Sequence, residues 1–352
     1  MNAVTRLLQK ARATAQRPVD VLGIGECSAD LVLKLPTGVS LSQALPDKLS
    51  ATGFLQLGGG QIATAMVAAQ RLGLRTALST AVGDDARSAQ LLQELAQEGV
   101  QLTAVQLCAG LPSRTALLLV DATGDRRVLE WRDPGLNLPT SRLTPDLIAS
   151  ARVLHVDLTY PEASLHAAAL AKQLGTLISV DLDQATPEAA QLLALADLCV
   201  VSEEFPKLLT GQPDPEQAAL HFAKVCGGLP VVTRGAAGCI ALLSAQSATS
   251  TAPQLTKLVV PALTPPVLLD TTACGDTFHA ALIAALLQAA TAEASDLADQ
   301  REQQQLTTWL HFACAAAALK CRDLGRRGCP TAAEVAAFIR QHPARSTTAT
   351  AS

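Results

Sequence analysis

The sequence predicts an α/β fold: a doubly wound, mostly parallel sheet with helices on both faces and a small inserted β-sheet. Short apolar segments typical of buried strands alternate with helical segments, and this alternation favours a parallel sheet covered by helices. Two segments, at about 27–56 and 112–135, break the alternation because they show strand-like patterns without long helices. We expect these two segments to form one small sheet that projects from the main domain.

Local signals predict the N-terminal half of the main sheet. Residues 19–26, VDVLGIGE, have the pattern of a short buried strand. A Gly-rich turn at 58–60 then precedes an Ala-rich helix that should stop at Gly73. Residues 75–83, RTALSTAVG, are expected to form the next strand, and residues 88–99, SAQLLQELAQEG, the next helix.

One β-hairpin is expected in the second inserted segment. The stretch SRTALLLVDATGDRRVLEWRD is strand-like on both sides of DATGD, which has the composition of a tight turn. This hairpin supports the small inserted sheet.

Four further strands complete the predicted main sheet: RVLHVDL, LISVDLD, DLCVVSEEF and LPVVTRG. Sheets of this kind bind ligands beyond the carboxyl ends of their strands. We therefore expect the polar residues at these strand ends to gather, namely Asp157, Asp181, Asp183, Ser202 and Thr233.

Composition and charge argue against several classes of protein. The formal net charge is −4 without a basic stripe, so nucleic acid is not an expected partner. No apolar run reaches the roughly 18 residues of a membrane helix, so no membrane partner is expected. The nine cysteines are scattered without a CxxC pair, which argues against a zinc site or a disulfide framework and fits a reducing cytoplasm.

Both termini are expected to lie outside a main domain that spans residues 19–340. Residues 1–18 are basic and lack the apolar centre of a signal peptide. We expect a frayed surface helix there, with an organelle transit segment as the alternative. Residues 341–352 have the composition of a disordered tail.

The stretch DTTACGDTFHAAL, residues 270–282, has the features of an anion site. Asp270 is expected to end a strand and a helix to begin near Gly275, so that unpaired backbone N–H groups point outward. Asp276 lies in the first turn, where a carboxylate can accept a proton from a hydroxyl that attacks a phosphoryl group. A helix-capping aspartate is the alternative interpretation.

Three motifs, in order, resemble those of a known family. DTTACGDTFHAAL resembles the DTxGAGDxF signature of the ribokinase/PfkB family of carbohydrate kinases. GGGQIATAMVAAQRLGLRTALSTAVGDD resembles the N-terminal signature of that family, and VVTRGAAG resembles the strand and turn that pack against its nucleotide. The resemblance covers residues 19–340 and implies a ribokinase-like fold.

The resemblance implies ATP-dependent phosphorylation of a sugar hydroxyl with Mg²⁺, and Asp276 as the catalytic base. The backbone amides of Ala273, Cys274 and Gly275 would hold the transferring phosphoryl group. The ATP pocket would be lined by Thr233, Gly235, Gly238 and Thr271. The sugar would contact Asp30, Gly59, Gly60, Gln61 and Thr64. The inserted sheet would close over the sugar as a lid and could also form a homodimer contact.

The chain departs from the family pattern at three motifs. Ala273 stands where the family has glycine, which we expect to be tolerated only if its φ is negative. Thr64 stands where the family has a sugar-binding asparagine. The NxxE motif, which helps to organise Mg²⁺, falls on SEEF at 202–205, where Glu203 or Glu204 could supply the metal-binding carboxylate.

The substrate is less constrained by the sequence than the reaction. Ketohexokinase-like members of the family also depart at NxxE, which makes a ketose such as fructose our first choice. Ribose, 2-keto-3-deoxygluconate and nucleosides stay open, as do the oligomeric state and the use of a monovalent cation. A sugar- or nucleotide-binding protein that lost turnover is the alternative from another class. GIGECS resembles a dinucleotide fingerprint, but Ser28 stands where its third glycine should be.

Three other side chains have alternative interpretations. Arg132 could contact the substrate or form a solvated ion pair. His279 is expected to be a packed or hydrogen-bonded histidine, because it shares no ligand spacing with His155 or His311. Cys274 is either a reactive thiol at the helix mouth that MgATP protects, or a buried small hydrophobe.

Overall fold

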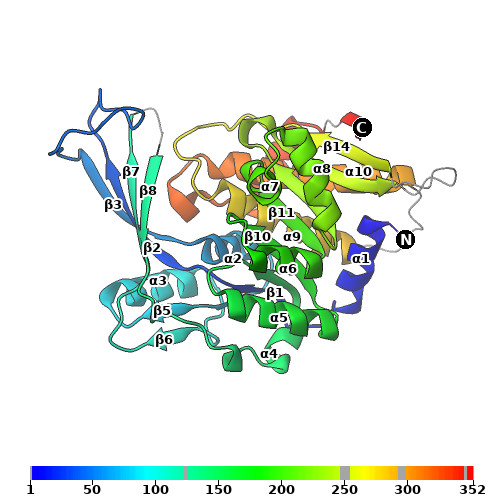
Figure 1. Ribbon diagram of the computed structural model, residues 1–352, viewed down its shortest axis with the longest axis horizontal. Coiled ribbons are helices and arrows are strands. Elements are labelled where there is room, and N and C mark those ends of the chain that lie inside the picture. Colours follow the sequence, from blue (N-terminus) through cyan, green and yellow to red (C-terminus); the bar gives the residue numbers. More distant parts are fainter. Residues whose placement is uncertain (1, 123–125, 246–253, 292–298, 345–346, 352) are drawn as a thin grey trace.

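The architecture is a central sheet between two layers of helices, with a small sheet that projects to one side (Figure 1). The computed structural model describes residues 2–122, 126–245, 254–291, 299–344 and 347–351. The predicted fold class is confirmed by the mostly parallel central sheet and its two helical layers.

Nine strands of the described residues form the central sheet, in the order β15–β14–β13–β12–β11–β10–β9–β1–β4. Six of them run parallel: β1 Val19–Ile24, β4 Thr76–Ser79, β9 Ala151–Val156, β10 Leu177–Leu182, β11 Leu198–Ser202 and β12 Leu229–Thr233. Three antiparallel strands extend one edge: β13 Cys239–Ala245, β14 Gln254–Val260 and β15 Thr347–Ala351. The parallel strands are buried on both faces, which explains their continuous apolar runs.

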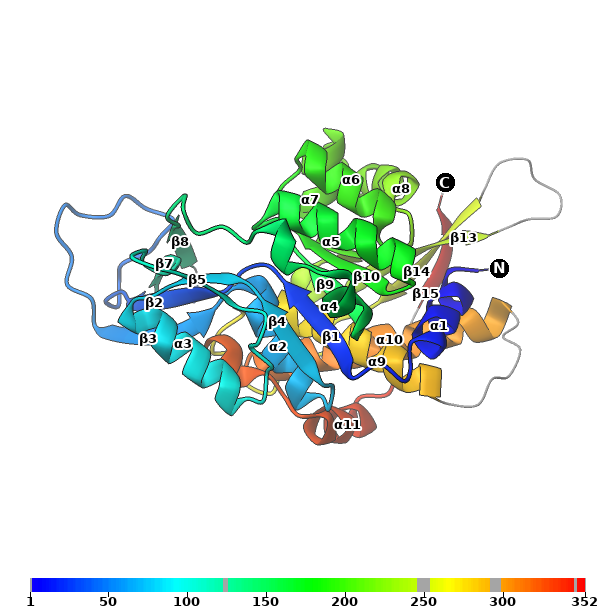
Figure 2. The same ribbon diagram turned by 90° about the horizontal axis from the view of Figure 1, so that it is seen from below.

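Helices cover both faces of this sheet, and Figure 2 shows the two layers on opposite sides of it. One layer contains α1 Ala3–Ala13, α2 Gln61–Arg71, α9 Cys274–Thr291, α10 Asp299–Lys320 and α11 Ala332–Gln341, and α3 Ala86–Gln97 joins its core. The other contains α4 Pro145–Ala149, α5 Pro161–Leu174, α6 Pro187–Leu195, α7 Glu204–Thr210 and α8 Pro215–Val225. Within the described ranges, no helix combines the length and the hydropathy needed to cross a membrane.

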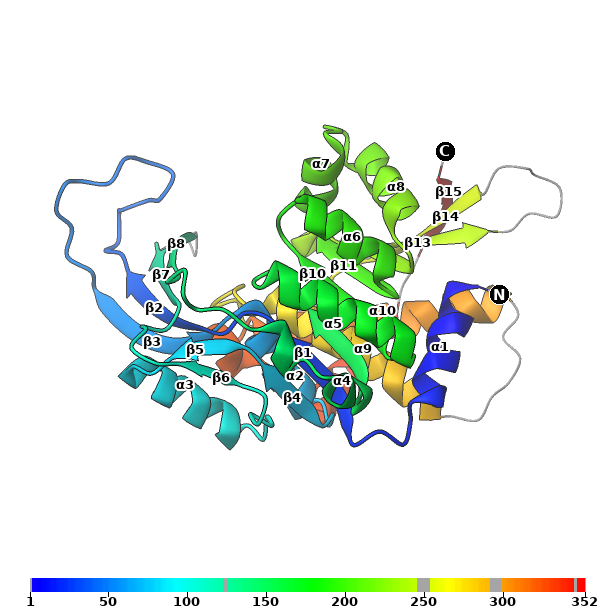
Figure 3. The same ribbon diagram turned by 60° about the horizontal axis from the view of Figure 1, so that its bottom comes forward.

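The projecting sheet has four strands in the order β3–β2–β7–β8 and lies to one side of the central sheet, next to α3, in Figure 3. Its strands are β2 Ser28–Lys34, β3 Gly53–Gly59, β7 Thr115–Val120 and β8 Arg126–Trp131. They come from the two segments that interrupt the strand–helix alternation of the sequence. β7 and β8 pair as the expected hairpin, although its turn, residues 123–125, lies outside the described residues. We call this four-stranded unit the projecting sheet.

The predicted strand at 75–83 is in fact two strands in different sheets. β4 belongs to the central sheet, whereas β5 Ala81–Gly83 pairs with β6 Gln106–Cys108 in a separate two-stranded sheet. The strand is interrupted at Thr80, and the N–H and carbonyl of the following residue, Ala81, are both bonded to the Tyr160 hydroxyl, at 3.1 and 3.0 Å. Because a buried backbone needs partners for both groups, this hydroxyl allows the chain to leave the central sheet.

Both predictions for the termini are wrong in part. α1 is a packed helix rather than a frayed one, because Val4, Leu7, Leu8 and Ala11 are buried in the core that α9 shares. Residues 347–351, expected to be disordered, pair as β15 with the otherwise open edge of β14. An exposed strand edge is a template for further pairing, and threonine favours extended structure, which accounts for the added strand.

Candidate active site

The segment that leads into α9 is irregular, so the predicted strand end at Asp270 is wrong. β14 ends at Val260, and α9 begins at Cys274. Residues 261–266 contain three prolines, which cannot donate ladder hydrogen bonds. The segment is therefore a loop, and we call residues 270–274 the α9 entry loop.

Asp270 anchors the entry loop to the end of α10. Its carboxylate accepts hydrogen bonds from the N–H groups of Thr272, at 2.8 Å, and Gly325, at 2.7 Å. It also pairs with the ammonium of Lys320 at 3.1 Å. These bonds hold the loop in one conformation where it turns into the helix.

Ala273 has a φ of +66°, the one positive value for a non-glycine residue in the described part of the chain. The condition under which we expected alanine to be tolerated here, a negative φ, is therefore not met. The Thr277 N–H, at 3.0 Å, and its hydroxyl, at 2.7 Å, both donate to the Ala273 carbonyl and hold the peptide in this orientation. A left-handed conformation costs an L-residue about 1–2 kcal/mol, so this position favours glycine.

The mouth of α9 is open to a ligand. A side chain at Gly275 would meet no atom within 4 Å, and the first N–H groups of a helix have no partner inside it. The Cys274 N–H is less free than expected, because it donates to the Thr271 carbonyl at 3.3 Å. The other amides of this turn, together with the helix dipole, have the arrangement that binds anions at helix N-termini, and binding of an anion here stays a prediction.

One cavity of about 250 Å³ joins this helix mouth to the projecting sheet. Ala273 and Asp276 line it from the side of α9. From the opposite side it is lined by five residues expected at the sugar, namely Asp30, Gly59, Gly60, Gln61 and Thr64. The structure therefore brings together residues that lie more than 200 positions apart in the sequence.

Two glycines allow the close approach of chains on the sugar side of the cavity. A side chain at Gly59 would lie 2.1 Å from the Asp30 carboxylate, which accepts a bond from Ser28 Oγ at 2.8 Å. A side chain at Gly60, where φ is +92°, would lie 2.6 Å from the Glu26 carbonyl. Both positions require glycine, and both hold Asp30 and the start of α2 at the cavity wall.

Asp183, one of the five polar strand-end residues expected to gather at the ligand-binding edge, lines the cavity, whereas the other four do not. Four further charged residues line it without having been predicted to do so: Glu26, Glu130, Arg126 and Arg326. Arg114 lies behind the lining and bridges two of these carboxylates, Glu26 at 3.2 Å and Glu130 at 2.6 Å.

The carboxylates of the site raise one another's pKa values. Burial, and then the charges of Asp181, Glu26 and Asp30, raise the pKa of Asp276 well above its usual range. Burial also raises the pKa of Glu26 to about 8 and that of Asp30 to about 6. A carboxyl group with a raised pKa is a stronger base once it is ionised, as general-base chemistry requires.

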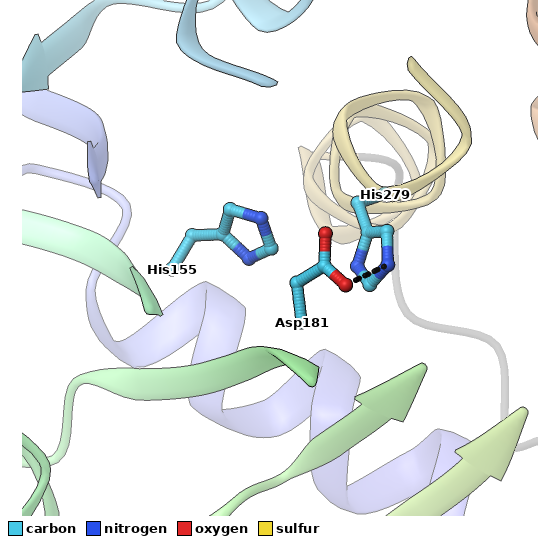
Figure 4. Close-up of side chains that lie close together, drawn as sticks. All are labelled: His155, Asp181 and His279. Carbon is cyan, nitrogen blue, oxygen red and sulfur yellow. Dashed lines mark ion pairs between the residues drawn. The ribbon is translucent and has the colours of Figure 1, made fainter. Parts of the chain in front are cut away.

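His155, Asp181 and His279 form a buried cluster (Figure 4). Asp181 was expected at the ends of the strands, and the expectation that His279 is packed or hydrogen-bonded is confirmed, whereas the contact among the three residues was not predicted. His279 is one turn after Asp276 on α9, and its Nε2 is 3.4 Å from Asp181 Oδ1. His155 Nδ1 is 3.1 Å from Ser179 Oγ, and the two imidazole rings are 5.2 Å apart. The ion pair with His279 lowers the pKa of Asp181 against the opposing effect of burial.

The residues expected at the nucleotide lie in two places. Thr233 ends β12, and Gly235 and Gly238 form the turn to β13, each with a positive φ. Gly238 is required there, because a side chain would lie 2.1 Å from the Val260 carbonyl. Thr271 is separate from this turn in sequence and lies exposed in the entry loop.

Two other predicted site residues do not line the cavity. The Arg132 guanidinium donates to the Thr159 carbonyl and lies 5.5 Å from the centre of the Tyr160 ring. A substrate contact of Arg132 stays a prediction. Glu204 is exposed at the start of α7 and pairs with Lys207 at 2.8 Å. A metal-binding role for Glu204 stays a prediction.

Cys274 points away from the anion site, toward α10. Its sulfur is 3.4 Å from that of Cys321 and 3.5 Å from the Ala317 carbonyl. The bond to Cys321 and burial raise the pKa of Cys274 above its usual value, whereas the pKa of Cys321 is lowered to about 7. The structure thus favours the packed interpretation of Cys274.

Comparisons with known proteins identify the family and the fold of this chain. A family model described as pfkB family carbohydrate kinase matches residues 20–333. Fructokinase-2 of Solanum habrochaites is 27% identical over 340 residues, covering 91% of this chain and 96% of that protein. Fructokinase of Solanum tuberosum is 28% identical over 314 residues, covering 87% and 90%. The structure of Arabidopsis thaliana ribokinase complexed with ribose and ATP superposes with a TM-score of 0.72 at 19% identity, covering 92% of this chain and 99% of that one.

Proposed function

The chain belongs to the pfkB family of carbohydrate kinases, and from this premise we propose that it transfers the γ-phosphoryl group of ATP to a hydroxyl of a ketose such as fructose. The observation that carries the proposal is the shared cavity. Asp276, the mouth of α9 and the glycine turn before α2 all line one space of about 250 Å³. That space is of the right order for one hexose beside a phosphoryl group.

Asp276 is the proposed general base. Its carboxylate lines the cavity in the first turn of α9, where it can accept the proton of a sugar hydroxyl. The amides at the helix mouth would hold the phosphoryl group as negative charge shifts among its oxygens. The raised pKa of Asp276 means that the site must favour its ionised form when substrate is bound.

ATP and Mg²⁺ are the proposed co-substrate and metal. The open space at Gly275 lets a phosphate chain approach the backbone closely, and the Arabidopsis ribokinase that shares this fold binds ATP. Carboxylate oxygens are the ligands that Mg²⁺ prefers, and Asp183 offers them at the cavity wall, which leaves Asp276 free to act as the base. Bound Mg²⁺ would neutralise phosphate charge.

A neutral ketose fits the lining better than an acidic sugar. Five carboxyl side chains line the cavity, against two arginines: Glu26, Asp30, Glu130, Asp183 and Asp276. Carboxyl groups exchange hydrogen bonds with hydroxyls, and those that are ionised repel a substrate carboxylate, which disfavours 2-keto-3-deoxygluconate. The relatives named fructokinase support a ketose, while ribose and nucleosides stay as alternatives.

The projecting sheet is the proposed lid and a homodimer contact. Its apolar inner residues, such as Val32 and Leu118, line a second cavity of about 460 Å³ against Leu268 and Leu269 of the loop before α9. Its outer face exposes Phe54, Leu129 and Trp131. A small sheet with two apolar faces is stabilised when other surfaces cover it.

Replacement of Asp276 tests this proposal. We expect Asp276→Asn to lower kcat by roughly 10²–10⁴ while the fold and nucleotide binding are retained, because amide and carboxyl have nearly the same shape. The measurement is sugar-dependent ADP release, with a thermal unfolding curve as control. Turnover within a few-fold of the unchanged enzyme would show that Asp276 is not the base. Absence of ADP release from the unchanged enzyme with every sugar would favour a binding protein, an alternative that the strained Ala273 also favours.

A further inference from the structure

Lys320 places a fully buried ammonium group behind the phosphate-binding end of α9. Its side chain is 0% exposed. Three oxygens surround the amine: the Asp270 carbonyl at 3.0 Å, Asp270 Oδ2 at 3.1 Å and the Asp323 carbonyl at 3.1 Å. A buried charge costs several kcal/mol unless it is paired and fully hydrogen-bonded, and here each of the three ammonium protons has an acceptor.

These three bonds hold segments that line the cavity. Asp270 accepts from the Thr272 N–H at 2.8 Å and from the Gly325 N–H at 2.7 Å, so Lys320 fixes the entry loop and the chain after α10 together. Thr272, Ala273 and Gly325 all line the cavity that contains Asp276. The loop must also maintain the unfavourable φ of Ala273, which persists only where the surroundings constrain it.

The oxygens around Lys320 form a site of the kind that binds a monovalent cation. Backbone carbonyls and a carboxylate are hard oxygen ligands that suit alkali ions, which form no directional bonds. A lysine ammonium is a compact point charge that meets the same oxygens with its three donors. Unlike a bound alkali ion, the lysine ammonium is covalently attached to the chain and cannot dissociate.

We propose that Lys320 is a positioning residue that supplies, from within the chain, the monovalent positive charge that orders the α9 entry loop for phosphoryl transfer. The proposal rests on the proposed kinase function. It goes beyond that function, because it states that the enzyme needs no K⁺ or NH₄⁺ and that one side chain is the reason. Lys320 touches neither sugar nor phosphate in this role; it acts through Asp270.

The first experiment measures kinase activity of the unchanged enzyme while K⁺ is replaced by tetramethylammonium at constant ionic strength and constant Mg²⁺. We expect kcat and KM for ATP to change by less than twofold. A severalfold activation by K⁺ would overturn the proposal, and this test needs no variant that might fail to fold.

The second experiment uses Lys320→Ala, which removes the charge and leaves a space lined by the three oxygens. We expect kcat/KM to fall about 100-fold, since a shift of about 1 Å in a positioning group has that effect. Addition of 100 mM K⁺ or NH₄⁺ should raise kcat/KM of this variant at least tenfold and should raise its unfolding temperature. Tetramethylammonium should do neither. Recovery by a cation of matching size is a result that a purely structural role for Lys320 would not give.

Two controls separate the explanations. Lys320→Gln keeps hydrogen-bond donors and fills the space but lacks the charge. Its kcat/KM should therefore be low, and K⁺ should not raise it. Lys10→Ala removes a lysine that pairs with Asp197 at 2.7 Å in another part of the molecule, and should show no cation effect. If Lys320→Ala keeps full activity, or is slow without any cation response, the inference is wrong. An Asp276→Asn variant with nearly full turnover would instead refute the kinase mechanism.

Discussion

Ala273 holds a backbone conformation that suits glycine, and its replacement should stabilise the protein. With φ at +66°, alanine is strained, whereas glycine is not. We expect Ala273→Gly to raise the free energy of unfolding by about 0.5–1 kcal/mol, after the greater entropy of glycine in the unfolded chain is subtracted. The measurement is chemical denaturation.

Ala273→Val is the matched control for this prediction. A β-branched side chain tolerates a positive φ worse than alanine, so the valine variant should be less stable than the unchanged protein. Equal stability of all three proteins would mean that the backbone relaxes at this position in solution. Activity of the glycine variant should be at least that of the unchanged enzyme, because the peptide amides keep their orientation.

Asp181 and His279 should shift the acid limb of the activity profile in opposite directions. Asp276 must be ionised to act as a base, so activity rises with pH through its pKa, which burial and then Asp181, Glu26 and Asp30 raise. Asp181→Asn removes a negative charge, lowers the pKa of Asp276 and should move the acid limb about one unit to lower pH. His279→Gln removes the partner of Asp181, which lies 3.4 Å away, and should move the acid limb to higher pH. The profile of log kcat/KM against pH measures both.

The groups that face this pair make the prediction specific. His155, Glu26 and Asp30 also act on Asp181 or Asp276 and are unchanged in both variants. A shift in the same direction for the two variants would mean that the changes act through packing instead of charge. The buried Asp181–His279 pair would then be structural.

At the same scale, the residues of the site divide into those with local signals and those without. Asp276, Gly59 and Gly60 were predictable because a helix mouth and a tight turn depend on neighbours within a few positions. Lys320 and Asp270 are 50 positions apart, and no local pattern marks their contact. His155, Asp181 and His279 come from three different elements, so only the folded chain reveals the cluster.

At the scale of elements, sugar binding should order the projecting sheet. In the structure, Arg126 at the start of β8 donates to the hydroxyls of Thr271 and Thr272 in the entry loop, at 3.2 and 3.1 Å. Leu268 and Leu269 are 66% and 60% exposed opposite the inner face of the sheet, so closure would bury them. We expect hydrogen exchange in residues 112–135 to slow when saturating sugar is added.

The two-stranded sheet of β5 and β6 is the internal control for hydrogen exchange. It lies outside the lining of both cavities, so its exchange should not change with sugar. Unchanged exchange in residues 112–135 at saturating sugar would argue against a closing lid. Equal slowing in both sheets would indicate a general gain in stability on binding.

The same scale shows where sequence patterns fail. The strand predicted over residues 75–83 was wrong because a single hydroxyl, that of Tyr160, bonds both backbone groups of Ala81 from 79 positions away. The strand end predicted at Asp270 was wrong because prolines earlier in the segment exclude ladder hydrogen bonds. Buried parallel strands such as β9 and β10 were predicted well, since a continuous apolar run is enough to define them.

At the scale of the whole molecule, α1 should be essential for stability, although none of its residues lines either cavity and Figure 1 shows it on the side of the molecule opposite the projecting sheet. Its apolar side chains Val4, Leu7 and Leu8 are at most 3% exposed and belong to the core that contains α9. We expect Leu7→Ala to lower the free energy of unfolding by about 2–4 kcal/mol, as for other buried leucines. That is a large part of the roughly 5–15 kcal/mol by which a typical domain is stable.

Lys10→Ala on the same helix is the matched control. Lys10 is 32% exposed and pairs with Asp197 at 2.7 Å, and such a partly exposed ion pair contributes about 1 kcal/mol or less. Chemical denaturation should therefore give Leu7→Ala a free energy of unfolding at least 1 kcal/mol lower than that of Lys10→Ala. Because α1 packs on the helix whose first turn carries Asp276, loss of its apolar face should also lower the temperature at which activity disappears. Equal, small effects of both substitutions would mean that α1 rests on the surface, as its basic sequence alone suggests.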